Sequence, residues 1–194
     1  MVRTAPPPLP PPPKAAYDQA QNQLIPTGAD AAQTEGFTGQ GVRVGIMGFG
    51  VDPTTPPLAG RIAWFKSYLP AGDQSPNDTT GHGTVVADIL AGSATGTLPA
   101  SNNEAFPGGV AQGASLYVEQ VCAATGNPPC DWNRVNYSDF VSEQVRVINE
   151  SVGAGNVQTE FTGPGDPNIP IVQAVFQPAV NAGILQVWCV GNDG

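Results

Sequence analysis

The only histidine of the chain, His82, stands in a setting that favours catalysis. It occurs in Thr80-Gly81-His82-Gly83-Thr84, where a loop gives way to an expected helix. The glycine before it leaves room for a substrate backbone, and the glycine after it lets the helix pack closely. Imidazole takes up and returns protons near neutral pH, which makes His82 a candidate general base and acid. A lone histidine is more often structural or merely exposed, and the residue type alone leaves that alternative open.

Three further segments combine glycines and polar residues at the ends of expected strands. They are Gly48-Phe49-Gly50, Ser151-Val152-Gly153 and Gly191-Asn192. The carboxyl ends of parallel strands meet at one rim, where active sites collect, so we expect the three segments to share a rim. The alternatives are a strand end packed in the core and, for the last segment, an ordinary turn.

The elements that must position these residues alternate along the chain. We expect strands at 42–47, 114–121, 147–149 and 184–190, and helices at 83–90, 140–145 and 172–180. The first helix has an expected apolar face of Val85, Val86, Ile89 and Leu90, residues 26–30 form a turn into a short helix, and residues 93–109 form a long loop. This order is typical of an α/β fold with a mainly parallel sheet and right-handed crossovers. The apolar strands indicate burial on both faces.

The composition favours a folded domain and argues against two classes of function. The 194 residues are 40% hydrophobic and 12% charged, which is enough for one domain with its own core. A net charge of −9 with scattered basic residues argues against nucleic-acid binding, which needs clustered lysine and arginine. No apolar run approaches the roughly 20 residues that a membrane span needs.

The ends of the chain and its cysteines add further expectations. Residues 1–16 are proline-rich and should form a stiff linker, with a ligand for a proline-binding module as the alternative. No apolar signal segment is visible there, so either an export signal is missing or the protein is not exported. Cys122 and Cys130 either close a local disulfide, which would imply an oxidising compartment, or stay free. Cys189, in an apolar run, is expected to be a buried thiol.

Five motifs in the same order resemble those of the subtilisin-like serine peptidases (subtilases, peptidase S8). They lie at residues 41–52, 81–87, 109–117, 147–153 and 190–194. The resemblance implies a subtilisin-like three-layer α/β fold with a mainly parallel sheet, truncated before its serine-bearing part. Residues 17–40 would be an N-terminal arm and residues 41–194 a partial peptidase domain. It also implies a peptide or protein substrate and a secreted or cell-surface location.

The same resemblance implies a role for each matched position. His82 would be the general base that accepts the proton of a serine hydroxyl and then the acid that returns it to the leaving amine. Asn192 would donate its side-chain amide to the oxyanion of the tetrahedral intermediate. Ser151, Val152, Gly153 and Gly191 would line the cleft, where an extended peptide pairs with the backbone.

Two departures from the family pattern bear on activity. Gly48 stands where the family has its triad aspartate, so no carboxylate at that position fixes the tautomer of His82. Asp52 lies past the turn and Asp78 on the other side of His82, so both are expected to be poor substitutes. No Gly-Thr-Ser-Met-Ala-like segment follows Asn192, so we expect this chain to lack the nucleophilic serine and the C-terminal part of the peptidase domain.

These observations leave two hypotheses for function. In one, the chain is a piece of a longer serine endopeptidase and is inactive alone; in the other, it is a catalytically inactive relative that binds peptides. An unrelated α/β domain that binds a small molecule has only the fold class in its favour. No cofactor is required by either hypothesis. Calcium remains a candidate ligand, with Asp73, Asn77 and Asp78 as its candidate partners.

Overall fold

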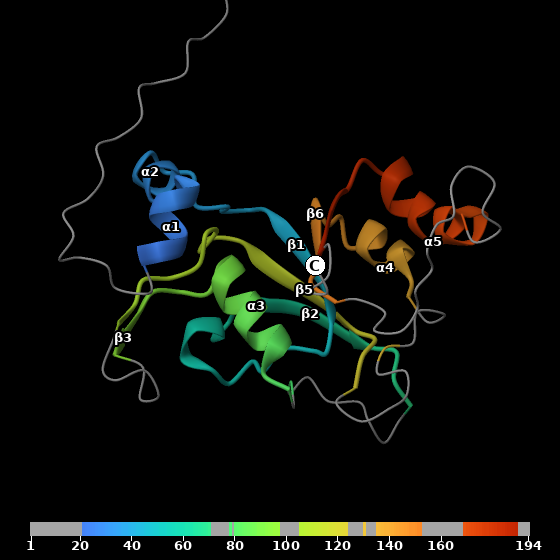
Figure 1. Ribbon diagram of the computed structural model, residues 1–194, viewed down its shortest axis with the longest axis horizontal. Helices are drawn as coiled ribbons and strands as arrows, with labels where there is room; N and C mark the ends of the chain where they lie inside the picture. The colour runs from blue at the N-terminus through green and yellow to red at the C-terminus, as the bar shows by residue number, and fades with distance from the viewer. Residues whose placement is uncertain are drawn as a thin grey trace, which may run out of the picture.

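A five-stranded parallel sheet forms the centre of the molecule (Figure 1). The computed structural model describes residues 21–70, 78, 80–97, 105–123, 130, 135–152 and 169–189. The strands lie in the order β2-β5-β1-β6-β7. Their bounds are β1 (Arg43–Gly48), β2 (Ile62–Ser67), β5 (Ser115–Gln120), β6 (Val147–Glu150) and β7 (Leu185–Trp188). The α/β fold with a parallel sheet, predicted from the sequence, is confirmed.

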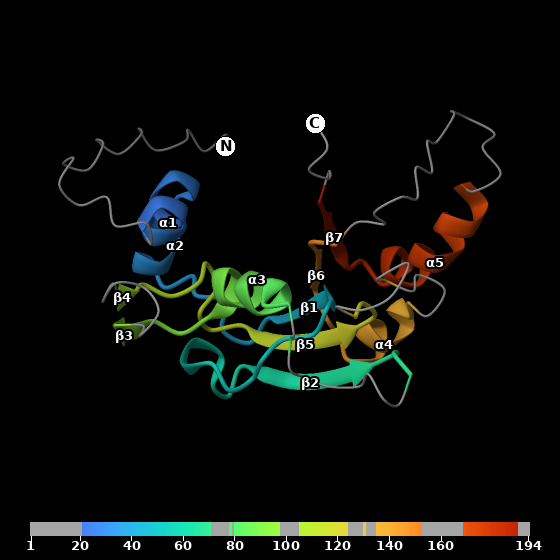
Figure 2. The same cartoon turned by 60° about the horizontal axis from the view of Figure 1, so that its bottom comes forward.

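Helices pack on both faces of this sheet, which gives three layers. They are α3 (His82–Ala91) on one face and α4 (Tyr137–Ser142) with α5 (Ile169–Asn181) on the other (Figure 2). Strand side chains alternate between the two layers. Ile46 and Val118 pack in a cluster that includes Ala87 of α3, whereas Met47 packs in a second cluster with Phe140 of α4.

The remaining elements are short, and some of them differ from the prediction. They are α1 (Gln21–Thr27), α2 (Ala29–Thr34), a 3-10 turn η2 (Pro56–Leu58), β3 (Thr95–Thr97) and β4 (Ala105–Phe106). The prediction of a loop over residues 93–109 is partly wrong, because this segment contains β3 and β4, which pair antiparallel. The sequence analysis also missed α1 and β2. The short helix expected after residues 26–30 is present as α2, which follows Gly28 with its φ of 74°.

The buried face of α3 differs from the predicted one. Val85 and Ile89 are 56% and 42% exposed, whereas Gly83 and Ala87 are buried. Small residues are needed here because the helix lies very close to the turn after β1. A Cβ atom on Gly83 would lie 2.0 Å from the carbonyl oxygen of Gly50. The predicted apolar face is therefore wrong for Val85 and Ile89, whereas Leu90 is half-buried and packs against the core.

The two helices of the other layer are placed by local signals. The helix expected at 140–145 begins and ends earlier, because Asn136 caps its start and Gln144 has a φ of 55° beyond its end. The Oδ1 atom of Asn136 accepts a hydrogen bond of 3.2 Å from the backbone N–H of Ser138. The helix expected at 172–180 is confirmed as α5, which contains Pro178 and is followed by Gly183 with a φ of 70°.

The three cysteines and the last strand, β7, differ in their burial. Cys122 and Cys130 form a disulfide, the first of the two expected alternatives. The prediction that Cys189 is buried is wrong, since its thiol is free and exposed. Cys189 directly follows β7, which pairs only with β6 among the described strands. Leu185 and Trp188 of β7 are accordingly 61% and 40% exposed, so burial on both faces is not found for this strand.

Candidate functional site

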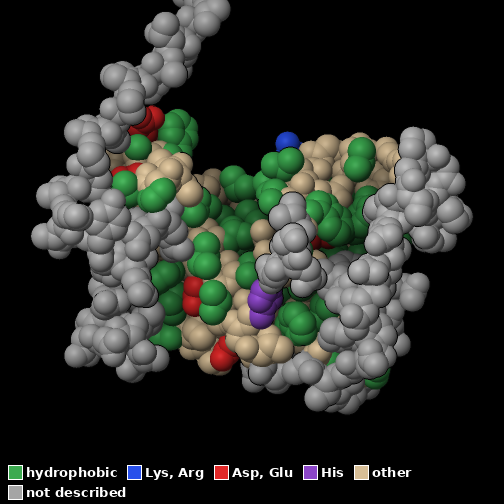
Figure 3. Space-filling model, in the orientation of Figure 1, with side chains coloured by type: hydrophobic (Ala, Val, Ile, Leu, Met, Phe, Trp, Pro, Cys, Tyr) green, Lys and Arg blue, Asp and Glu red, His purple; other side chains and the backbone are tan. Residues whose placement is uncertain are grey.

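His82 is the first residue of α3 and lies exposed at the surface of the molecule (Figure 3). The helix begins after Gly81, whose φ of 77° favours glycine. The imidazole Nε2 lies 2.6 Å from the carbonyl oxygen of Ser151, just beyond the end of β6. The ring also meets Phe49 edge to face, with ring centroids 5.8 Å apart. The structure thus brings His82 to the rim where β1 and β6 end.

The contact with Ser151 determines which imidazole nitrogen carries the proton. A carbonyl oxygen only accepts hydrogen bonds, so Nε2 must be the donor. In the neutral ring the lone pair then lies on Nδ1. A general base that activates a hydroxyl needs the opposite tautomer, with Nδ1 protonated and the lone pair on Nε2. In this arrangement His82 is unable to accept a proton through Nε2.

Gly48, at the end of β1, provides no group to reverse that tautomer. Within the described part of the chain, the imidazole makes its only hydrogen bond with Ser151. A Cβ atom on Gly48 would lie 3.1 Å from Cγ1 of Val152. Val152 is buried, so its side chain occupies part of the space that a side chain at position 48 would need.

The carboxylates of the two aspartates near the site accept hydrogen bonds from threonines. Asp52 Oδ1 accepts hydrogen bonds from the N–H and hydroxyl of Thr54, at 2.8 and 2.7 Å. The Oδ1 atom of Asp78 accepts hydrogen bonds from the N–H and the hydroxyl of Thr80. Its Oδ2 atom accepts a hydrogen bond of 2.9 Å from the N–H of Thr84. Asp78 therefore stabilises the first turn of α3, whose free N–H groups and positive dipole end favour an anion.

Replacing Asp78 with alanine is expected to lower the free energy of unfolding by about 1–2 kcal/mol at pH 7, as for the loss of other helix caps. Burial acts to raise the pKa of Asp78, but hydrogen bonds from Thr80 and Thr84 outweigh it and hold that pKa below its ordinary value. A depressed folded-state pKa stabilises the fold above the ordinary carboxyl pKa, and this contribution is lost as the pH falls.

Urea denaturation followed by circular dichroism measures this effect. Asp52→Ala is the matched control, and we expect it to change stability less, because among the described residues the carboxylate of Asp52 accepts hydrogen bonds only from the exposed Thr54. The difference between wild type and D78A should shrink as the pH falls below the ordinary carboxyl pKa, because protonation then competes with the hydrogen bonds to the carboxylate. A difference that stays constant throughout the acid range in which the chain remains folded would contradict this role.

Several predicted residues lie outside the described residues: Gly153, Gly191, Asn192, Asp73 and Asn77. The roles given to them remain predictions. Within the described ranges, no group of three or more His, Cys, Asp or Glu side chains is placed to hold a metal ion. None of the helices in those ranges is long and apolar enough to cross a membrane.

The sequence analysis missed two buried carboxyl groups, Glu119 of β5 and Glu150 of β6. Both side chains are 0% exposed. The hydroxyl of Tyr137 donates a 2.6 Å hydrogen bond to Oε2 of Glu150. The available signal was an acidic residue close behind a short apolar run in a strand expected to have neighbours on both sides.

Comparisons with known proteins decide the family to which this arrangement belongs. The sequence profile of the subtilase family matches residues 39–194. The chain is a subtilase. The resemblance found from the five motifs is therefore confirmed, and the three-layer α/β structure agrees with it.

Individual relatives of this chain are named subtilisins or serine proteases. Subtilisin E of Bacillus subtilis (strain 168) is 30% identical over 92% of the chain and 42% of its own length. Subtilisin Savinase of Lederbergia lenta is 32% identical over 89% of the chain and 57% of its own length. The Major intracellular serine protease of Bacillus subtilis (strain 168) is 29% identical, over 82% of the chain and 46% of its own length. The chain thus spans about half the length of these relatives.

Proposed function

We propose that this subtilase chain is part of a longer protein, a serine endopeptidase that hydrolyses peptide bonds, and that it carries the catalytic histidine. The observation that carries the proposal is the position of His82, which starts α3 and contacts the carbonyl group of Ser151 at the end of β6. Peptide substrates would pair with the backbone of Ser151, Val152 and Gly153 beside Gly191. Asn192 would supply the oxyanion donor.

The exposed edge of the sheet supports a role for the rest of the peptidase domain. Leu185, Val187 and Trp188 of β7 are 61%, 46% and 40% exposed. An apolar edge strand is a template for a further strand. Since the chain spans only 42% of Subtilisin E, a C-terminal part of the domain would add to β7 and bring the nucleophilic serine.

One observation favours a second function, peptide binding without cleavage. Gly48 carries no carboxylate, and the Nε2 atom of His82 donates to Ser151 in place of offering a lone pair. In the chymotrypsin-like triad, removing the charge of the aspartate lowers kcat by about 10⁴. A subtilase with this arrangement would keep the cleft and lose most of the chemistry.

The location of the protein follows from its disulfide in this proposal. The Cys122–Cys130 disulfide supports an oxidising compartment, and hence a secreted or cell-surface protein. Similarity to these relatives does not by itself determine the compartment, because one of them is named a Major intracellular serine protease.

Cleavage of a chromogenic peptide amide by the complete reading frame tests the endopeptidase proposal. We expect slow turnover by the complete protein, a further loss of at most about 10²-fold in His82→Ala because triad losses are not additive, and no turnover by this chain alone. A serine-directed phosphonate should label the complete protein and leave this chain unlabelled. Peptide binding without turnover, unchanged by H82A, would replace the endopeptidase with the binding function. Labelling of the chain alone would contradict the assignment of the serine to another part.

A further inference from the structure

Two buried glutamates, Glu119 and Glu150, flank Met47 on the face of the sheet that α4 and α5 cover. Glu119 is the register partner of Met47, and Glu150 lies one residue beyond Asn149, the partner of Ile46. Both side chains are 0% exposed. We call these two residues the acid pair.

The acid pair has too few hydrogen-bond partners for two charged groups. Neither oxygen of Glu119 has a partner in the described part of the chain, nor has Oε1 of Glu150. The backbone N–H of Asn136 favours the carboxylate of Glu119 slightly, without forming a hydrogen bond of normal geometry. Tyr137 donates to Oε2 of Glu150. A buried carboxylate without a partner is costly, whereas its protonated form is far less so.

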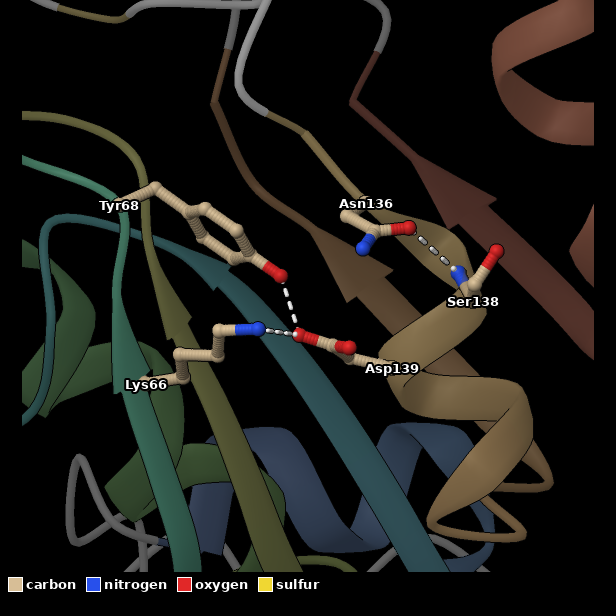
Figure 4. A network of polar contacts seen from close by, with 5 residues as sticks. All are labelled: Lys66, Tyr68, Asn136, Ser138 and Asp139. Atoms are coloured by element: carbon tan, nitrogen blue, oxygen red, sulfur yellow. Dashed lines mark hydrogen bonds and ion pairs between the residues drawn. The ribbon is translucent and has the colours of Figure 1, made fainter.

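The nearest cation does not offset the charge of the pair. Lys66 of β2 binds Asp139 of α4, with 2.5 Å between Nζ and Oδ2, and the hydroxyl of Tyr68 donates to the same oxygen (Figure 4). Asp139 itself raises the pKa of Glu119, while Lys66 lowers it less. The ion pair at this edge of the sheet therefore brings no net positive charge to the acid pair.

Among the described residues, no other element supplies a cation at this position. Arg43 of β1 lies at the opposite end of its strand, where it donates to the carbonyl group of Glu143 and stacks over Tyr117. The sequences of β6, β7 and α5 contain no lysine, arginine or histidine. Tyr137 of α4 stays a neutral donor, because burial and Glu150 raise its pKa.

We propose that the acid pair is a pH-dependent positioning device for the rim of the candidate site. Protonated, the pair lets β6 pack closely against α4 and α5; ionised, it loosens that packing. Glu150 is the last residue of β6 and directly precedes Ser151, whose carbonyl group contacts His82. The rim is a peptide cleft only under the proposed function, but the effect on stability does not depend on that function.

The sign of the pH dependence follows from the raised pKa values. Burial raises the pKa of Glu119 to about 8, with Asp139 adding to it, and burial raises the pKa of Glu150 to about 8 despite the hydrogen bond from Tyr137. The stabilisation is therefore complete below the ordinary carboxyl pKa and is lost as the pH rises through about 8. Burial also raises the pKa of Asp88, on α3, to about 6. The stabilisation that depends on protonated Asp88 is therefore almost entirely lost before pH 8. A fall in stability between pH 7 and 9 reports mainly on the acid pair.

Thermal unfolding of the chain between pH 5 and 9 tests this device. We expect the Tm of the wild type to fall by on the order of 10 °C across this range. Glu119→Gln and Glu150→Gln should each remove a clear part of the fall, whereas the exposed control Glu35→Gln should follow the wild type. A wild-type Tm that does not change between pH 7 and 9 would overturn the proposal, as would slopes in E119Q and E150Q equal to that of the wild type.

Hydrogen exchange on the wild type keeps the proposal testable if a glutamine variant does not fold. After correction for intrinsic rates, protection at residues 147–152 should fall roughly tenfold or more from pH 6.5 to 9, while protection in α3 falls less. An equal loss in both segments would overturn the positioning role. Neither measurement involves peptide cleavage, so failure here is separate from failure of the proposed function.

Discussion

Replacing Gly83 with alanine is expected to lower the free energy of unfolding by about 3 kcal/mol or more, which is large for a single added methyl group. The new Cβ atom would lie 2.0 Å from the carbonyl oxygen of Gly50 and 3.2 Å from its carbonyl carbon. The obstacle is backbone, which has no side-chain rotamer to give way. Either the first turn of α3 or the turn after β1 must therefore move, and His82 moves with it.

Gly48→Ala is the matched control for this substitution. Its Cβ atom would meet only Cγ1 of Val152, at 3.1 Å, and this side-chain end can shift by a few tenths of an ångström. We expect a cost of about 1 kcal/mol or less for G48A, measured by urea denaturation under the same conditions. The NMR signal of the single histidine should shift more in G83A than in G48A. Equal costs for the two variants would show that the close approach at Gly83 does not position α3.

The sequence was sufficient for four of the five strands of the parallel sheet and for the position of His82 at the rim. Strands of β-branched residues separated by helical segments allow few arrangements. The glycines beside the histidine also carry a specific signal, because Gly81 has a positive φ and Gly83 lies against Gly50. Local patterns of this kind can be interpreted from the sequence, because they depend on the backbone geometry at a single position.

Features set by contacts between distant segments were not predicted. Val85 and Ile89 of α3 are exposed, because closeness to the turn after β1 selects small residues for the buried face. Cys189 is exposed because β7 lies at the edge of the described sheet. The burial of Glu119 and Glu150 depends on α4 and α5 covering their strands, and no periodicity within β5 or β6 reports that cover.

Introducing aspartate at Gly48 is expected to reverse the tautomer of His82. A carboxylate at the end of β1, where the resemblance of the motifs places the triad aspartate, would accept a hydrogen bond from Nδ1 and leave the lone pair on Nε2. The chain has 1 histidine, so ¹⁵N NMR of the neutral ring gives one unambiguous answer. The wild type should show the Nε2–H form, as its contact with Ser151 requires, and G48D the Nδ1–H form. Gly48→Asn is the matched control, because it has the same size and no charge.

The same substitution should restore catalysis if the chain works within a complete subtilase. In the complete reading frame, we expect G48D to raise kcat by about 10³–10⁴-fold over the wild type and G48N to leave it low, since a charged partner for the imidazole is worth about 10⁴ in the triad. Val152 must yield to the new side chain, because its Cγ1 atom lies 3.1 Å from the position of a Cβ on residue 48. Val152→Ala in the G48D background removes that obstacle and separates crowding from chemistry. An unchanged tautomer and unchanged kcat in both G48D and G48D/V152A would show that position 48 does not face His82 as the triad requires.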